Sequence, residues 1–248
     1  ISQLCEPLKK AGHTITYYPD RNEEEEVLIE RGHKADIIVV SNIPLRKHFL
    51  DHCPNLKMIS VAFTGLDHID LETCRQRGIT VRNAAGYSTH AVAELAIGMM
   101  IAVYRKIVGG DAITRLGGDR KNFLGTELHQ KTLGIIGTGA IGYQVARLGL
   151  AFGCRVIAYN RTPRELENIR MVDKNTLLQE ADIISLHIPL TPETKDFIGE
   201  AEFKLMQPHA ILINTDRGPI VNKKALHEAL RKSKIAGAAV DVYDQEPP

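Results

Sequence analysis

A glycine-rich turn between a strand and a helix constrains the fold of this 248-residue chain more than any other feature. Residues 132–137 read TLGIIG, a short apolar run typical of a strand that is buried on both faces. Gly137, Gly139 and Gly142 form the pattern G-x-G-x-x-G, and the helical stretch AIGYQVARLGLAFG continues from it. A strand, a glycine turn and a helix in direct succession predict the start of a doubly wound α/β domain.

The spacing of the glycines predicts that this turn binds phosphate. Gly137 permits the tight turn, Gly139 lets a pyrophosphate approach the backbone, and Gly142 lets the helix pack closely on the strand. The free amides of Ala140 and Ile141, at the helix N-terminus, add partial positive charge. The unit therefore predicts a bound dinucleotide, with a purely structural turn as the alternative.

The end of the second strand indicates which dinucleotide is bound. Such units usually place Asp or Glu there to hold the adenosine ribose, whereas this chain reads VIAYNRTPR with Asn160 at that position. A carboxylate would repel a 2′-phosphate by about 4 kcal/mol at ~4 Å and an effective dielectric constant of about 20. Asn160 removes this repulsion, and Arg161, Thr162 and Arg164 offer donors that suit a phosphate. These residues favour NADP(H), and NAD(H) stays possible if both arginines are solvated.

The remaining sequence alternates β-branched runs with amphipathic stretches, which indicates parallel sheets covered by helices. In the first part, strands are expected over 13–19, 35–41, 56–63 and 78–83, and helices over 23–32, 44–53 and 71–78. In the second part, strands are expected over 132–137, 155–159, 182–188, 210–215 and 236–242. Between them lie a long helix over 88–106, which Ser88 or Thr89 can cap, and a Gly-rich connecting arm over 109–130.

This pattern predicts an α/β fold of two domains with a boundary near Tyr87. Residues 1–87 are expected to form a flavodoxin-like domain, and residues 88–248 a Rossmann domain that includes the long helix and the arm. The chain opens inside an expected helix with no strand before it, and it stops just after a strand. A cut at each end, leaving both domains incomplete, is therefore expected.

Composition narrows the possible partners. The net charge of +1 and the scattered Lys and Arg residues give no reason to expect nucleic acid or an anionic membrane. No apolar stretch reaches the roughly 18 residues of a membrane span. The four cysteines are too far apart for a CxxC site, so we expect buried, reduced thiols in a cytoplasmic protein and no metal site.

Polar residues follow several of the expected strands. The stretch LINTDRGPIVN puts Arg217 just past the fourth strand of the second domain, and AVDVYDQEPP puts Asp241 at the end of the fifth, with Glu246 beyond it. In the first domain, SVAFTGLDHIDL puts Thr64 and Gly65 just past a strand. Parallel sheets bind ligands at the carboxyl ends of their strands, and a cleft between two α/β domains would bring these ends together.

Together with the glycine turn, these stretches resemble the D-isomer-specific 2-hydroxyacid dehydrogenase family, specifically in the second domain and more loosely in the first. The resemblance implies an enzyme that passes hydride between nicotinamide C4 and the hydroxyl- or keto-bearing carbon of a small D-2-hydroxy or 2-keto acid. Residues 1–87 would then be the substrate domain and residues 88–248 the NAD(P)-binding domain. The family also implies a homodimer, with the helix from Ala91 and the arm through Phe123 as the contact.

Carried over by position, the resemblance implies a role for each polar residue. Arg217 would be the catalytic arginine, which grips the substrate carboxylate and the reacting oxygen. The amides of Thr64 and Gly65 would bind the other side of the carboxylate, with Thr64 also close to the nicotinamide. Asp241 would accept the nicotinamide carboxamide, and Glu246 would pair with the catalytic histidine. Further cofactor neighbours would be His187, Pro189, Thr215 and Asp216.

Two features depart from the family pattern. Asp216 stands where the family usually has a small residue, and it could pair with Arg217 and weaken its grip on substrate, or point into solvent. The family's catalytic histidine, which delivers a proton to the substrate oxygen, lies beyond Glu246 and outside these residues. His187 or His68 could substitute, although a structural or cofactor-neighbouring role is favoured for both. The chain as printed is thus expected to bind cofactor but to catalyse poorly.

The substrate is less constrained. Ser41 and Asn42 stand where phosphoglycerate enzymes of the family tend to place arginine, and the Asn-Arg-Thr loop resembles glyoxylate and hydroxypyruvate reductases. Both observations favour a small unphosphorylated acid, but Arg46 could reach inward, which keeps D-3-phosphoglycerate open. Formate dehydrogenase is disfavoured because its formate-binding residues have no clear match. Two alternatives from other classes are a dinucleotide-sensing corepressor on the same fold and an adenosyl-nucleoside hydrolase that shares the glycine turn, for which the chain is too short.

Overall fold

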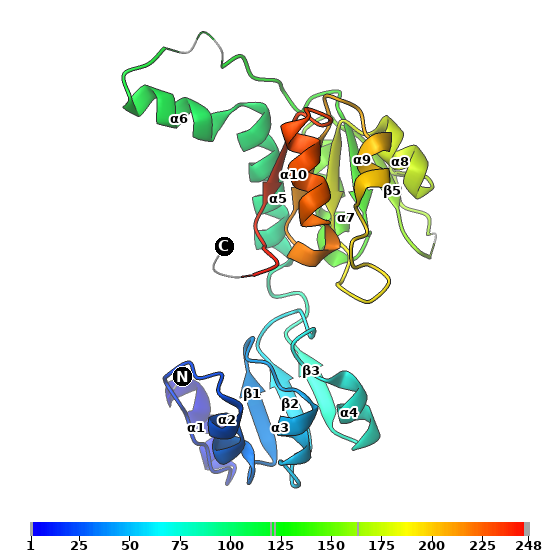
Figure 1. Cartoon of the computed structure of the whole chain (residues 1–248). Coiled ribbons are helices and arrows are strands. Elements are labelled where there is room, and N and C mark those ends of the chain that lie inside the picture. Colours follow the sequence, from blue (N-terminus) through cyan, green and yellow to red (C-terminus); the bar gives the residue numbers. More distant parts are fainter. Residues whose placement is uncertain (1, 120, 122, 163, 246–248) are drawn as a thin grey trace. The chain divides into compact units, whose positions relative to one another are not determined.

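The computed structural model describes residues 2–119, 121, 123–162 and 164–245, with the side chains described from Cys5 onward. The chain divides into two compact units, Ile1–Ala84 and Ala85–Pro248 (Figure 1). The sequence placed its domain boundary near Tyr87. Each unit is an α/β structure built on a parallel sheet, as the alternating pattern predicted.

The first unit has a three-stranded parallel sheet in the order β1 (Ile37–Val40), β2 (Met58–Val61), β3 (Thr80–Asn83). Its helices are α1 (Ser2–Lys10), α2 (Glu25–Gly32), α3 (Lys47–Asp51) and α4 (Leu71–Gln76). Ile59 of the central strand pairs with Ile38 and Val81, and it is fully buried in a core that also contains Phe49 and Leu50. This core fixes the loop that follows β2.

The strand expected over residues 13–19 is wrong. This segment is irregular, and Tyr17 and Tyr18 are exposed. An alternating pattern predicts a strand because one face of a strand is normally buried. Here the described residues provide no partner strand. The Arg31 guanidinium lies over the Tyr18 ring, yet both tyrosines stay exposed, so alternation alone does not produce a strand.

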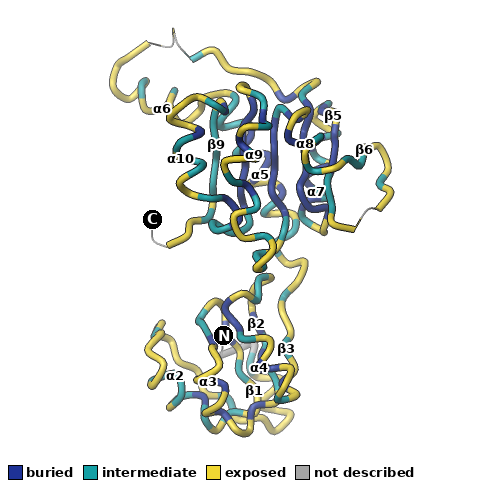
Figure 2. Tube along the Cα trace, turned by 45° about the vertical axis from the view of Figure 1, so that its right-hand side comes forward, coloured by how far each residue is buried: buried dark blue, intermediate teal, exposed yellow. Residues whose placement is uncertain are grey.

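The second unit has a six-stranded parallel sheet in the order β6-β5-β4-β7-β8-β9. The strands are β4 (Thr132–Ile136), β5 (Arg155–Tyr159), β6 (Arg170–Met171), β7 (Ile183–Leu186), β8 (Ile211–Asn214) and β9 (Gly237–Val240). Every residue of β4, β7 and β8 is buried (Figure 2). This is the strand order of a Rossmann fold. The first strand of the unit, β4, lies in the middle, β5 and β6 follow on one side of it, and β7, β8 and β9 follow on the other.

Helices cover both faces of this sheet. The helices are α5 (Thr89–Tyr104), α6 (Ile107–Arg115), α7 (Ala140–Ala151), α8 (Lys174–Glu180), α9 (Glu200–Leu205) and α10 (Lys223–Arg231), with a short 3₁₀ helix η1 (Gly218–Ile220). On one face, α5 and α7 pack against Leu133 and Ile135 of β4. On the other face, α8, α9 and α10 enclose Ile136 together with Ile184 and Leu212. The doubly wound fold is therefore confirmed.

Several local expectations for this unit differ from the structure. The edge strand β6 was not predicted, because its two residues are too few to show a period of two. The arm was expected to be irregular, yet α6 occupies its first part, where Asp111 and Arg115 form an i,i+4 ion pair at 2.8 Å. Ser88 occupies the N-cap position of α5, but its side chain makes no capping hydrogen bond.

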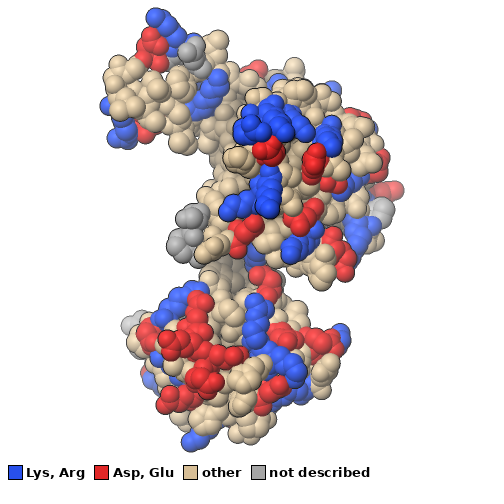
Figure 3. Space-filling view, in the orientation of Figure 1, with Lys and Arg blue, Asp and Glu red and all other residues tan. Residues whose placement is uncertain are grey.

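Surface properties agree with the even composition. Figure 3 shows both acidic and basic side chains on each of the two units. No helix among the described residues is long and apolar enough to cross a bilayer. Cys53, Cys74 and Cys154 are buried free thiols, whereas Cys5 is only half-buried, which corrects the expectation that all four are buried.

Candidate active site

The glycine turn follows β4 and has the geometry of a cradle. Gly137 has φ +93°, and a Cβ there would lie 2.1 Å from the carbonyl oxygen of His187. A Cβ on Gly142 would lie 2.0 Å from the carbonyl oxygen of Gly137, so both positions need glycine for packing. A Cβ on Gly139 would meet no protein atom within 4 Å and would project into open space. The protein itself does not require glycine at position 139, whereas a ligand lying against the backbone would.

Helix α7 begins directly after this turn, with Gly139 as its N-cap and no side chain capping it. The first amides of the helix, including those of Ala140 and Ile141, therefore have no intrahelical acceptor and can bind an anion. Two buried hydroxyl groups lie at the carboxyl ends of strands of this sheet: Thr138 Oγ1 after β4 and Thr215 Oγ1 after β8. Neither has a hydrogen-bond partner among the described residues. The open cradle, the free amides and the orphaned hydroxyls fit a dinucleotide.

Asn160 ties the end of β5 to the glycine turn. Its Oδ1 accepts a hydrogen bond from the Thr138 amide at 3.4 Å, and its Nδ2 donates to the carbonyl oxygen of Thr162 at 2.7 Å. A carboxylate could accept the first bond but could not donate the second. Arg164 donates a hydrogen bond to the carbonyl oxygen of Thr138, which brings a positive charge onto the glycine turn. Arg161, directly after Asn160, is exposed.

His187, at the end of β7, is a buried neutral imidazole. Its Nε2 lies 2.8 Å from Ser185 Oγ, and burial lowers the pKa of His187 to about 4. At neutral pH the ring carries no imidazolium proton that it could deliver to a substrate. Its carbonyl oxygen contacts the glycine turn, and two residues later the Pro189 carbonyl oxygen accepts from Thr194 Oγ1 at 2.6 Å. The structure therefore favours the structural reading of His187 over a proton-donating one.

Asn214, which was not predicted as a site residue from the sequence, holds the loop after β8. Asn214 is 1 % exposed, its Oδ1 accepts from the Asp216 amide at 3.1 Å, and its Nδ2 donates to the Arg217 carbonyl oxygen at 2.9 Å. Arg217 has an extended backbone, and its Nη1 donates to the Asp216 carbonyl oxygen at 2.7 Å. The sequence signal that could have identified Asn214 is a polar amide residue at the end of the apolar run ILI, three residues before the expected catalytic arginine.

Asp216 turns inward. The residue is half-buried, and its carboxyl accepts a hydrogen bond from the Ile188 amide in the loop after β7. Burial raises the pKa of Asp216 to about 7, against the opposing effects of the Arg217 charge and of this hydrogen bond. The alternative in which Asp216 points into solvent is therefore wrong.

Asp241 follows β9, and its amide donates to the Asn214 carbonyl oxygen at 3.0 Å, which places its exposed side chain next to the β8 loop. Gly218 packs against the same segment, since a Cβ there would lie 2.3 Å from the backbone of Tyr243. Glu246 lies outside the described residues. The carboxyl edge of this sheet thus brings together most of the predicted cofactor residues and Arg217.

In the first unit, Thr64 and Gly65 lie in the loop after β2. Asn83 Nδ2 donates to the Thr64 carbonyl oxygen at 2.6 Å, while the amides of Thr64 and Gly65 donate no hydrogen bond within the described part of the chain. Two successive free amides can bind an anion. Arg46 reaches the same loop and donates to the Asp67 carbonyl oxygen at 3.2 Å.

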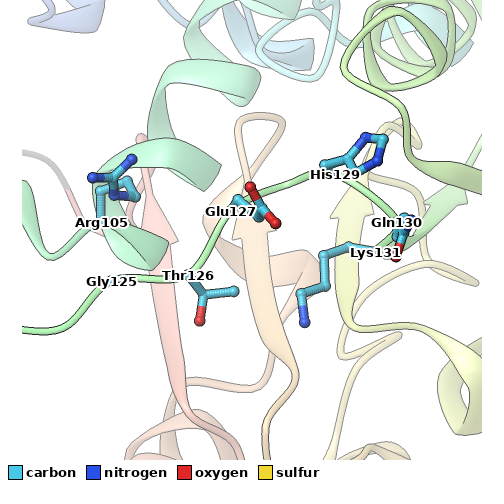
Figure 4. A pocket seen from close by; sticks show the side chains of 7 residues that line it. All are labelled: Arg105, Gly125, Thr126, Glu127, His129, Gln130 and Lys131. Atoms are coloured by element: carbon cyan, nitrogen blue, oxygen red, sulfur yellow. The ribbon is translucent and has the colours of Figure 1, made fainter.

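A cavity of about 570 Å³ lies away from these residues, at the opposite end of the second unit's sheet (Figure 4). Its lining includes Arg105, Glu127, His129 and Lys131, and Lys131 immediately precedes the amino end of β4. Ligands of doubly wound sheets bind at the carboxyl ends of the strands. We therefore do not assign the dinucleotide to this cavity.

Comparison with known proteins gives a consistent result. Residues 97–248 match the family model described as D-isomer specific 2-hydroxyacid dehydrogenase, NAD binding domain. A glyoxylate reductase of Thermococcus litoralis is 45% identical over 234 residues, which cover 89% of this chain and 71% of the relative. A D-3-phosphoglycerate dehydrogenase of Methanocaldococcus jannaschii is 42% identical over 231 residues, which cover 90% of this chain and 44% of the relative.

Two solved structures extend the comparison to the fold. An acyclic imino acid reductase in complex with NADPH and D-Arg superimposes with a TM-score of 0.92 at 34% identity, covering 99% of this chain and 80% of that one. A D-lactate dehydrogenase from Aquifex aeolicus, complexed with NAD and lactic acid, gives 0.90 at 35% identity, covering 99% and 74%.

Proposed function

The chain belongs to the D-isomer-specific 2-hydroxyacid dehydrogenase family, and we propose that it transfers hydride between NADP(H) and a small 2-keto or D-2-hydroxy acid such as glyoxylate or hydroxypyruvate. The single observation that carries the proposal is the cradle at Gly139, which leaves space for a ligand and is not needed for packing. When bound, the cofactor supplies or accepts the hydride at its nicotinamide ring.

The second unit's residues would hold the dinucleotide along the carboxyl edge of the sheet. The glycine turn and the amides of Ala140 and Ile141 would bind the pyrophosphate. Thr215 offers an orphaned hydroxyl, and Asp241 offers an exposed carboxylate for the carboxamide group. Further contacts are proposed for Thr64, His187, Pro189 and Asp216.

Preference for NADP(H) is supported by the loop after β5. Asn160 leaves no negative charge where a 2′-phosphate would lie, and Arg161, Thr162 and Arg164 offer donors for it. Similar folds are found in solved structures that contain NADPH and in others that contain NAD. Because the fold alone does not decide between the cofactors, the proposal depends on these loop residues.

Arg217 is proposed to bind the substrate carboxylate and to polarise the carbonyl that receives the hydride. The extended backbone that Asn214 fixes would preorganise the guanidinium. Thr64 and Gly65, of the first unit, are proposed to bind a carboxylate through their free amides. Glu246 is proposed to orient the histidine that supplies the proton, because His187 is neutral near pH 7.

A second candidate is D-3-phosphoglycerate dehydrogenase. Arg46, which hydrogen-bonds to the loop that contains Thr64, favours it because a guanidinium there could bind a phosphate. Ser41 and Asn42 favour the unphosphorylated acid instead. Relatives named for both activities are similar to this chain, so substrate tests have to separate them.

Homodimerisation is also proposed, through α5, on which Leu95 is exposed, and through the arm, whose first part is α6. Val108, Leu116 and Leu124 are 75%, 83% and 86% exposed, a concentration of apolar surface that a second copy would cover. The free thiols suit the reducing cytoplasm, where we propose that the protein acts.

The first test is a parallel titration of the chain with NADPH and NADH, followed by nicotinamide fluorescence. NADPH should bind more tightly, and Arg161→Ala should weaken NADPH binding while leaving NADH binding nearly unchanged. Arg147→Ala, which removes an exposed arginine of α7 that pairs with Gln144, is the matched control. Preference for NADH in the unchanged chain would contradict the cofactor assignment.

The second test compares substrates with the full-length protein. Glyoxylate, hydroxypyruvate and 3-phosphohydroxypyruvate are each offered with the preferred reduced cofactor. Faster turnover of the unphosphorylated acids supports the first candidate, and faster turnover of the phosphorylated acid supports the second. Tight cofactor binding without turnover of any keto acid would instead identify a dinucleotide sensor.

A further inference from the structure

Asp216 is a half-buried carboxyl at the carboxyl edge of the second unit's sheet. It follows β8 directly after Thr215, whose hydroxyl is orphaned, and it precedes Arg217. Its carboxyl accepts from the Ile188 amide in the loop after β7. The same loop touches the glycine turn, because a Cβ on Gly137 would meet the backbone of His187 and the side chain of Ile188. Asp216 is therefore built into the loops that line the proposed cofactor site.

The sheet order indicates which half of a dinucleotide would lie near this carboxyl. A dinucleotide crosses a doubly wound sheet at the point where the strand order reverses, which here lies between β4 and β7. The adenosine half belongs to the side of β5, where Asn160 lies. The nicotinamide half then belongs to the side of β7 and β8, next to Asp216.

The two redox states of the nicotinamide ring differ by one positive charge. We propose that Asp216 discriminates between them: its carboxylate stabilises the cationic ring of the oxidised cofactor, and its neutral acid favours the uncharged ring of the reduced cofactor. This inference rests on the proposed function, because it requires a dinucleotide at the glycine turn. It assigns a role in cofactor discrimination to a side chain that the hydride transfer itself does not need.

The surroundings of Asp216 set the pH range of this effect. Burial raises the pKa of Asp216 to about 7, and the Arg217 charge and the Ile188 amide limit the rise. The neighbouring loops contribute His187, which is neutral at this pH because burial lowers its pKa to about 4, and the exposed Asp241 after β9. Asp216 therefore gains its charge as the pH rises through neutrality.

Linkage gives the sign of the expected effect. Above about pH 7 the carboxylate favours the oxidised cofactor, and below it the neutral acid removes that preference. Reciprocally, binding of the oxidised cofactor should release a proton from Asp216, whereas binding of the reduced cofactor should not. If Asp216 only balanced the charge of Arg217, its protonation would change the affinity for both cofactors alike.

The test measures the dissociation constants of NADP⁺ and NADPH for the chain, by calorimetry, from about pH 5.5 to about pH 8.5. The dissociation constant of NADP⁺, divided by that of NADPH, should fall as the pH rises. The fall should be about tenfold if the cationic nicotinamide ring lowers the pKa of the Asp216 carboxyl by about one. Asp216→Asn should abolish the pH dependence of the ratio. Glu167→Gln, which removes an exposed charge of the same unit, should keep it.

Each other outcome has a definite meaning. A ratio that does not change with pH, or one that changes equally in Asp216→Asn, would overturn the inference while leaving the proposed function intact. Failure of both NAD(H) and NADP(H) to bind at any pH would overturn the proposed function and this inference with it. If Asp216→Asn does not fold, proton release is measured on the unchanged chain in buffers of different ionisation enthalpy. Release with NADP⁺ but not with NADPH supports the inference, and equal release refutes it.

Discussion

Alanine substitutions at Gly139 and Gly142 should separate ligand binding from packing. The two glycines lie in the same turn and helix, yet an added methyl group meets different surroundings. At Gly139 it would meet no protein atom within 4 Å, and φ −65° is accessible to alanine. At Gly142 it would lie 2.0 Å from the carbonyl oxygen of Gly137, so the backbone must move.

The expected magnitudes differ accordingly. Gly139→Ala should change the free energy of unfolding by less than about 1 kcal/mol, which is the scale of N-cap effects. A methyl group that displaces the pyrophosphate from one charged hydrogen bond should cost about 1.5–3 kcal/mol of binding, or about tenfold to about a hundredfold in affinity. Gly142→Ala should destabilise the fold by about 1–3 kcal/mol, lowering the melting temperature by roughly 2–4 °C per kcal/mol.

Thermal unfolding without ligand and titration with NADPH measure the two effects on the same samples. Gly98→Ala is the control, because Gly98 lies inside α5 with open space around it, and alanine there should stabilise slightly without changing binding. The reasoning is refuted if Gly139→Ala binds NADPH as well as the unchanged chain, or if it melts as low as Gly142→Ala.

Three further predictions follow from the same structure. Asn214→Ala removes both hydrogen bonds that hold the Arg217 loop and should cost about 2 kcal/mol of unfolding free energy in denaturant, with substrate turnover reduced more than NADPH affinity. Burial raises the pKa of Asp216 in the folded state to about 7, above the ordinary value of 3.8, so its stabilising contribution is full at low pH and is lost as the pH rises through 7. Asp216→Asn should therefore gain stability relative to the unchanged chain between about pH 5 and about pH 8, by roughly 2 kcal/mol in chemical denaturation. Leu116→Glu should convert a sedimenting dimer to a monomer, whereas Leu230→Glu, on the exposed side of α10, should not.

The elements best predicted from sequence are those whose signal is local. The strands β4, β7 and β8 are short continuous apolar runs, because both of their faces are covered, and the glycine turn marks the start of the sheet order. The two-residue β6 has no period to detect, and residues 13–19 have a strand-like period without a neighbour to bury it. A local hydrophobic pattern therefore predicts a strand correctly only where neighbouring strands and helices of the folded chain bury its apolar side chains.

The candidate site divides in the same way. Gly137 could be named from sequence because the glycine spacing fixes the turn, whereas the proposal for Arg217 came from the family resemblance of the stretch after β8. Asn214 has only a weak sequence signal, its place at the end of an apolar run, because its role arises from two hydrogen bonds within one folded loop. The inward orientation of Asp216 likewise depends on the Ile188 amide, which comes from another strand connection.

Contacts between successive loops link the whole carboxyl edge of the second unit. Asn160 joins the β5 loop to the glycine turn, the His187 carbonyl joins the turn to the β7 loop, Asp216 joins the β7 and β8 loops, and Asp241 bonds to Asn214. In this series Asn160 lies at one end and Arg217 near the other. Under the proposed cofactor assignment, a substitution at the Asn160 end would change the preferred cofactor without moving the arginine, because the buried strands β4 and β7 lie between them. The same separation would allow one fold to be found with NADPH in one solved structure and with NAD in another.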